Sequence, residues 1–225
     1  MDMLRGLRCE QAMDYENGFY WFADPNRMGK LCAQYELYKR IVGLPGDIVE
    51  TGVFKASTLI RLATFRSFFE ATASRTIYAF DAFGKFPCDV VSLEADAKYA
   101  CGYDARFGEG LSAAEIDALL AAKGIAGNVH YVEGDICSTM PAFFEERPDL
   151  PLAFVHVDVE VYEPTRTILE CCWERLVPSG LLLLDDYNQT TGAAKAIKEF
   201  FRGRPGVRFE KLPLGDSPTF ICKTC

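Results

Sequence analysis

Two kinds of hydrophobic pattern alternate along the chain from residue 46 onward. Short apolar runs predict β-strands, and longer segments with apolar residues every three or four positions predict α-helices. The expected strands are 46–53, 76–83, 128–136, 152–160 and 180–188. The expected helices are 57–71, 112–125, one within 163–180, and 191–203. Because the strands are apolar throughout and alternate with helices, the pattern predicts a parallel sheet covered by helices on both faces.

The remaining segments complete this prediction. Residues 207–224 are expected to form two strands around a Gly-Asp turn, an antiparallel hairpin that brings the predicted sheet to seven strands. We expect a single α/β domain of Rossmann-like architecture over residues 1–225, with a helical cap or lid at 1–44 and the core at 45–225. Residues 84–111 are the least regular stretch and form a second candidate lid.

Composition and charge exclude several classes of partner. The 225 residues carry a formal net charge of −8 with scattered basic residues, which does not suit a nucleic-acid partner. No uncharged apolar stretch of about 18 residues predicts a membrane span, and the first residues lack the apolar core of a signal peptide. We therefore expect a cytoplasmic protein, away from membranes. Its nine cysteines show no zinc-site spacing and are expected to be free thiols.

Acidic residues stand at the ends of all five expected parallel strands. In an open parallel sheet, ligands bind outside the carboxyl ends of the strands. The acids should therefore gather at the edge where such sheets bind their ligands. In chain order they are Glu50, Asp81, Asp135, Asp158 and the adjacent pair Asp185 and Asp186.

The first strand–helix junction indicates what kind of ligand binds there. In ETGVFKAS (50–57), Gly52 permits a tight turn and a close approach of a ligand to the backbone. A glycine-rich loop that would cradle a diphosphate is missing, which disfavours a dinucleotide and a nicotinamide-dependent oxidoreductase. A nucleoside ligand without phosphates fits better. Asp81 stands where an acid binds ribose hydroxyls in such folds. The alternative is that Asp81 is a capping aspartate.

Asp158, Asp185 and Asp186 form an oxygen-rich cluster at two expected strand ends. Neighbouring carboxylates need a compensating cation, and oxygen ligands select Mg²⁺, Ca²⁺ or Mn²⁺ over zinc. The alternative is that Asp186 caps the next helix and one acid alone is functional. His156 shares the face of Asp158 deeper in the strand, as a buried structural histidine or as a catalytic group.

Four segments resemble the macrocin O-methyltransferase (TylF-type) family of class I S-adenosylmethionine-dependent methyltransferases. They are PGDIVETGVFKAST (45–58), FDAFGKFP (80–87), HVDVEVYEPT (156–165) and LVPSGLLLLDDYNQTTGAAKAIKEFF (176–201). Three residues depart from the family's pattern. Ala56 replaces a glycine, Glu160 replaces an aspartate, and Asp135 replaces an aromatic residue.

The resemblance implies a Mg²⁺-dependent enzyme that methylates a hydroxyl of a sugar or another natural product and that forms homo-oligomers. It implies metal ligands at Asp158, Asp185 and Asp186, with Asp158 also a possible base and His156 a second catalytic candidate. A catechol-type acceptor is an alternative, as is a non-catalytic relative that binds a nucleoside or a metal. The expected cofactor-binding residues are Glu50, Thr51, Gly52, Ser57, Thr58, Asp81, Ala82, Phe83 and Asp135.

Overall fold

A mostly parallel sheet forms the centre of the protein, in a computed structural model that describes residues 2–87, 91, 93–187, 189–215 and 217–224. The strand order is β5-β4-β3-β6-β7-β8. The first five strands of this order are parallel, and β8 runs antiparallel to β7. This arrangement confirms the predicted fold class. The strands are β3 (Asp47–Thr51), β4 (Ile77–Asp81), β5 (Val129–Glu133), β6 (Leu152–Val157), β7 (Leu176–Leu184) and β8 (Thr219–Cys222).

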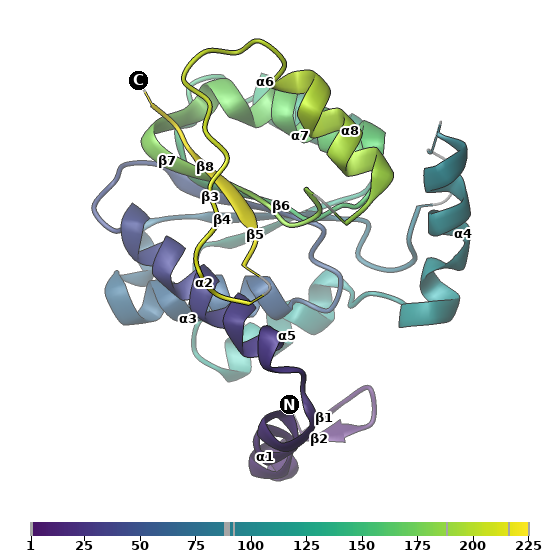
Figure 1. The fold of residues 1–225 in the computed structure, drawn as a ribbon. Coiled ribbons are helices and arrows are strands. Elements are labelled where there is room, and N and C mark those ends of the chain that lie inside the picture. The colour runs from purple at the N-terminus through teal and green to yellow at the C-terminus, as the bar shows by residue number, and fades with distance from the viewer. Residues whose placement is uncertain (1, 88–90, 92, 188, 216, 225) are drawn as a thin grey trace.

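Helices cover both faces of the sheet (Figure 1). Helices α2, α3 and α5 lie on one face, and α6, α7 and α8 lie on the other. Leu181 and Leu183 of β7 pack toward the first layer, and Leu182 and Leu184 pack toward the second. Burial on both faces explains the unbroken apolar run of this strand. The helices of the two layers are α2 (Pro25–Ile41), α3 (Ser57–Phe69), α5 (Ala113–Ala122), α6 (Ile136–Glu145), α7 (Tyr162–Cys172) and α8 (Thr191–Phe200).

The sheet has six strands among the described residues, where the sequence predicts seven. The segment before β8 pairs with it at a single bridge, between Glu210 and Phe220. Pro218, which stands opposite Leu212 in this register, has no N–H to extend this ladder. The N–H of Leu212 donates to the Ser217 hydroxyl at 3.2 Å instead. The second strand of the predicted hairpin is therefore reduced to one bridge, and β7 is the main antiparallel partner of β8.

The stretch 84–111 contains a helix, α4 (Glu94–Phe107), where an irregular segment was expected. This helix stands apart from the two helical layers at one side of the molecule (Figure 1). Its buried Asp96 accepts a hydrogen bond from the N–H of Tyr162, the first residue of α7, at 2.8 Å. A Cβ at Gly192 of α8 would overlap the Asp96 carboxylate. Asp96 thus attaches α4 to the amino ends of α7 and α8, where a negative charge is favourable.

Replacing Asp96 by alanine is expected to lower the free energy of unfolding by about 1–2 kcal/mol, because the first turn of α7 loses a charged acceptor. Denaturant unfolding measures the loss, and hydrogen exchange of α4 amides should rise. Glu94→Ala is the control, because Glu94 is an exposed acid in the same turn of α4. Equal losses for the two variants would contradict the attachment role of Asp96.

The N-terminal segment begins with a small hairpin, β1 (Met3–Leu4) and β2 (Leu7–Arg8), followed by α1 (Ala12–Phe22). Figure 1 shows these elements projecting from the body of the molecule. Helix α1 has no buried residue, and Trp21 and Phe22 near its end are 70% and 83% exposed. Helix α2 differs, because Leu37 and Ile41 are fully buried in the core.

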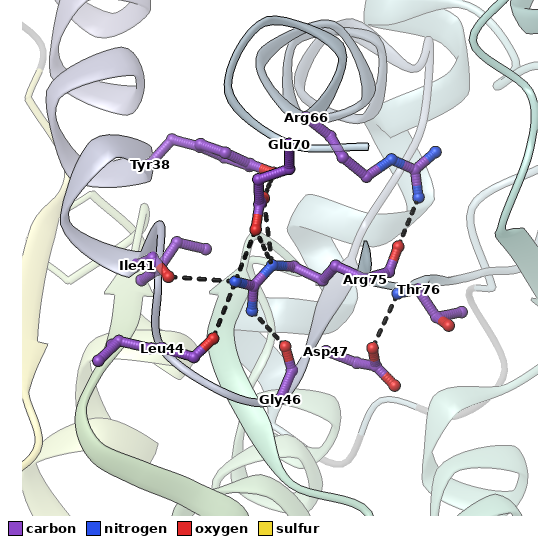
Figure 2. Close-up of polar contacts among 9 residues, drawn as sticks. All are labelled: Tyr38, Ile41, Leu44, Gly46, Asp47, Arg66, Glu70, Arg75 and Thr76. Carbon is purple, nitrogen blue, oxygen red and sulfur yellow. Dashed lines mark hydrogen bonds and ion pairs between the residues drawn. The ribbon is translucent and has the colours of Figure 1, made fainter. Parts of the chain in front are cut away.

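A buried ion pair fastens the C-terminal end of α2 at the edge of the sheet opposite the carboxyl ends of the strands. The Arg75 guanidinium pairs with Glu70 at 2.9 Å, and Figure 2 shows this contact and its neighbours. Arg75 also donates to the carbonyl groups of Ile41 and Leu44 at 3.1 and 3.0 Å. The Tyr38 hydroxyl donates to Glu70 at 2.6 Å. These bonds supply partners for backbone oxygens that the end of a helix leaves unpaired.

The structure bears on two further expectations, one about membrane-spanning helices and one about the cysteines. None of the helices that the structure describes is both long enough and apolar enough to cross a membrane. The cysteines in this part of the chain are free thiols, as expected, while Cys88 and Cys225 lie outside the described residues.

Candidate active site

A pocket opens at the carboxyl ends of β3, β4, β5 and β6, where a parallel sheet places its ligands. It is open to solvent and has a cavity volume of about 140 Å³. Helix α4 forms one wall of it, through Tyr103 and Asp104. The expected site residues that line this pocket are Gly52, Asp81, Ala82, Asp135 and Asp158.

Gly52 lets two strand ends approach each other closely. Its φ is +74°, and an added Cβ would overlap the carbonyl oxygen of Asp158. Both features require glycine at this position. Ala56 also adopts a left-handed conformation, with φ +60°, just before α3. It stands where the resembling family has glycine, so this chain accepts backbone strain at a fully buried alanine.

Asp81 organises the loops around the pocket. Its carboxylate accepts the N–H of Phe54 at 2.9 Å and the N–H of Phe83 at 2.7 Å. These bonds tie the loop after β3 to the loop after β4. Burial raises the pKa of Asp81, although the two backbone donors favour the charged form. Asp81 also lines the pocket.

Glu50 is a buried acid without a full set of partners. It is 1% exposed, and its Oε2 has no hydrogen-bond partner among the described residues. Burial raises the pKa of Glu50 to about 8. An unpaired buried carboxyl oxygen is unfavourable unless a ligand brings a donor. Glu50 is therefore suited to bind a cationic group.

The other expected cofactor-binding residues have structural partners. The Thr51 hydroxyl donates to the carbonyl of His156 at 2.8 Å, and the Thr58 hydroxyl accepts from Gln34 at 3.2 Å. Asp135 is the N-cap of α6 while also lining the pocket. Ser57 is exposed at the start of α3, and Phe83 is buried in the core. The pocket wall does not include Glu50, Thr51, Ser57, Thr58 and Phe83.

Beside the pocket, β6 and β7 bring three potential ligand groups together. One ligand atom from each of His156, Asp158 and Asp185 lies within 4.8 Å of the others. His156 is fully buried, and neither ring nitrogen has a hydrogen-bond partner in the described chain. Its Nε2 is 3.9 Å from Asp185 Oδ1. Two carboxylates with an unpartnered imidazole form a donor set that fits a divalent cation.

Lys30 enters this cluster from helix α2. Its Nζ donates to Asp185 Oδ2 at 2.7 Å and lies 3.8 Å from Asp158 Oδ2. Burial opposes the charge of Asp185, but His156 and Lys30 outweigh burial and lower the pKa of Asp185 below its ordinary range. Burial and the neighbouring Asp185 raise the pKa of Asp158 to about 6. Sequence reasoning missed Lys30. Clustered acids indicate that a positive charge lies nearby, but they do not indicate which residue of the chain supplies that charge.

Asp186 lies next to this cluster and has a different partner. Its carboxylate accepts the N–H of Glu160 at 2.9 Å. Glu160 has φ +65°, and its side chain is hydrogen-bonded to Tyr99 of α4. Burial raises the pKa of Asp186 to about 8 and that of Glu160 to about 7. Asp186 therefore holds the loop after β6 and does not cap α8, whose N-cap residue is Thr190.

Two curated proteins are similar to the chain in sequence. One is the 8-demethyl-8-(2,3-dimethoxy-alpha-L-rhamnosyl)-tetracenomycin-C 4'-O-methyltransferase of Streptomyces olivaceus, 29% identical over 172 residues. The other is the mycinamicin III 3''-O-methyltransferase of Micromonospora griseorubida, 27% identical over 172 residues. The matches cover 73% and 75% of this chain. They cover 61% and 65% of the relatives, so the chain spans less than two thirds of their length.

Solved structures share the fold. CalS11, a calicheamicin methyltransferase, superposes with a TM-score of 0.70 at 24% identity, over 93% of this chain and 84% of its own. The O-methyltransferase NovP gives a TM-score of 0.75 at 20% identity, over 88% and 80%. The architecture is thus that of methyltransferases. In sequence, the macrocin-O-methyltransferase family matches residues 9–208, which is most of the chain. The chain belongs to the macrocin-O-methyltransferase (TylF) family.

Proposed function

We propose that this chain is an S-adenosylmethionine-dependent O-methyltransferase that acts on a hydroxyl of a sugar or another natural product. One observation carries the proposal: Asp158 lines the pocket and also belongs to the cluster with His156 and Asp185. A cofactor in the pocket and an acceptor hydroxyl at the cluster would therefore meet at one residue. Both curated relatives are named as O-methyltransferases, one of them with a rhamnosyl compound in its name.

Residues in the pocket wall and the buried Glu50, which lies outside that wall, fit this cofactor. S-adenosylmethionine supplies an activated methyl group on a sulfonium centre. The unpartnered oxygen of Glu50 suits the ammonium group of the cofactor, and the bare backbone at Gly52 leaves room close to the strand end. Asp81 presents carboxylate oxygens suited to ribose hydroxyls. A related fold, TomG from Streptomyces achromogenes, was solved in complex with SAM at 16% identity and a TM-score of 0.53.

The cluster supplies the acceptor side of the reaction. Asp158 is placed to take the proton of an acceptor hydroxyl, and His156 below it is the second candidate. Asp158 and Asp185, with Asp186 or His156, would hold a divalent cation, which orients acceptor oxygens and lowers the pKa of a hydroxyl. The exposed apolar side chains of α1 support self-association, for which they offer a surface.

Replacing Glu50 by glutamine is expected to weaken the binding of S-adenosylhomocysteine by about 10-fold or more, because a charged hydrogen bond to the ammonium group is lost. Isothermal titration calorimetry measures the change. Glu133→Gln is the matched control, since Glu133 ends β5 and is exposed. Unchanged affinity in Glu50→Gln would reject the contact between Glu50 and the ammonium group. The cofactor assignment itself is tested separately, by titrating wild-type protein with S-adenosylhomocysteine.

Removal of divalent cations tests the second half of the proposal. Methyl transfer to a panel of sugars, glycosylated natural products and catechols should fall to background with EDTA and return with excess Mg²⁺. Activity on catechols alone would favour the catechol-type alternative. Activity that EDTA leaves unchanged would reject the cation. Cofactor binding without turnover on any acceptor would favour the non-catalytic alternative, and no cofactor binding at millimolar concentration would reject the whole proposal.

A further inference from the structure

The Lys30 ammonium group lies against the carboxylate oxygens that a divalent cation would need as ligands. Its Nζ lies 2.7 Å from Asp185 Oδ2 and 3.8 Å from Asp158 Oδ2, and its side chain is 15% exposed. The third group of the cluster, His156, has two unpartnered ring nitrogens. The carboxylates of the cluster are therefore already compensated by a charge from this chain, while the imidazole nitrogens have no hydrogen-bond partner among the described residues.

The helix that carries Lys30 is held firmly in place. A Cβ at Gly29, the residue before Lys30, would overlap the backbone of Gly215 in the loop before β8. Gly215 in turn lies against the Asn26 side chain. Helix α2 is thus packed against its neighbours at the position of Lys30. This packing places the Lys30 side chain within reach of the cluster. The four-carbon stem is the flexible part, and it lets the ammonium group leave without moving the helix.

A lysine ammonium and a divalent cation cannot share these oxygens at low cost, because two positive charges within a few ångströms repel each other strongly in a buried setting. The environment adds to this repulsion, since Arg27 also acts electrostatically on Asp158 and Lys30. Cation binding and the Lys30–Asp185 ion pair are therefore alternatives at one place.

We propose that Lys30 is a displaceable counter-ion that closes the cation site of this chain, so that Lys30 leaves Asp185 whenever a divalent cation binds. The inference rests on the cation site of the proposed function. It gives the N-terminal segment a role in the site, because α2 sets how readily the site accepts a cation. Without Lys30, Asp158 and Asp185 lose a positive charge that lies within 4 Å of both, so the empty protein is less stable and its affinity for a cation is higher.

The test is a titration of chelator-treated protein with Mn²⁺, followed by electron paramagnetic resonance. Lys30→Met keeps most of the stem and removes the charge, and it is expected to bind Mn²⁺ about 10-fold or more tightly than wild type. Lys39→Met is the matched control on the same helix, where Lys39 pairs with Glu36 at the surface. It should bind Mn²⁺ as wild type does. Lys30→Arg keeps a positive charge and should also retain wild-type affinity.

A second readout does not depend on affinity. The melting temperature of Lys30→Met should lie below that of wild type without a cation, and saturating Mn²⁺ should close the gap. Lys30→Gln serves the same two measurements if the methionine variant does not fold. Adding Asp185→Asn should abolish the tight binding, and tight binding that survives this change would place the ion elsewhere and overturn the inference.

Failure of this inference is distinguishable from failure of the proposed function. Equal or weaker Mn²⁺ binding by Lys30→Met, with binding by wild type intact, would overturn the counter-ion role and leave the cation site standing. Mn²⁺ binding by neither chain would overturn both the counter-ion role and the cation part of the proposed function. The cofactor part is then judged separately, by titration with S-adenosylhomocysteine.

Discussion

Asp185→Asn is expected to reduce methyl transfer by about 10²–10³-fold, the loss that follows removal of one charged group from a preorganised site. Asp185 is the centre of its cluster, with Lys30 at 2.7 Å and His156 Nε2 at 3.9 Å. Asparagine keeps the shape and one oxygen but loses the charge that a cation needs. Steady-state kinetics and Mn²⁺ binding measure the two effects, and circular dichroism checks that the variant is folded.

Asp186→Asn is the matched control for this prediction, because it makes the same change at the adjacent residue. The Asp186 carboxylate accepts the N–H of Glu160 at 2.9 Å, and asparagine retains an oxygen for that bond. We expect Asp186→Asn to retain at least about 10-fold more activity than Asp185→Asn. Equal losses would mean that both acids bind the cation directly. An Asp185→Asn enzyme with more than about a tenth of wild-type activity would contradict the central role of Asp185.

The strand ends were predictable because strand burial leaves a strong pattern in the sequence. An unbroken apolar run such as Leu181 to Leu184 indicates a strand covered on both faces, and the structure shows alternate leucines in the two cores. The acids that follow such runs must then share one edge of a parallel sheet. The neighbourhood of Asp158 and Asp185 was predicted in this way, and their strands β6 and β7 do pair.

Helix α4 was not predictable from the same kind of pattern. Among its described residues, Asp96 and Ala100 are the buried ones, so its sequence lacks an apolar stripe. Its position depends on a polar contact, from Asp96 to the N–H of Tyr162. Helix α6 was also missed, and it carries Pro141 in its interior, which ordinarily argues against a helix.

Lys30 shows a different limit of sequence reasoning. It is 155 residues from Asp185 and belongs to a helix whose sequence contains no recognised motif. The pairing of the two depends on how α2 packs against the sheet and the loop before β8. Packing of that kind follows from side-chain and backbone shapes, such as the two glycines at 29 and 215, and not from hydrophobic periodicity.

The second large effect concerns stability. Arg75→Met is expected to lower the free energy of unfolding by about 3–5 kcal/mol, the loss typical of a buried ion pair that is broken by removing one partner. Arg75 is 3% exposed, and its loss leaves Glu70 without its charge partner. The carbonyl groups of Ile41, Leu44 and Gly46 lose a donor at the same time (Figure 2). Denaturant unfolding with an unchanged slope measures this loss.

Arg166→Met is the matched control, because Arg166 also pairs with a glutamate, Glu170, at 2.8 Å, but on the exposed surface of α7. An exposed pair four residues apart on a helix is screened by solvent, so this variant should change the free energy of unfolding little. A double replacement of Arg75 and Glu70 by methionine should cost less than the sum of the two single losses, since no charge is left unpaired. Similar losses in Arg75→Met and Arg166→Met would show that burial does not set the strength of this contact, and that the end of α2 is held to β3 by other interactions.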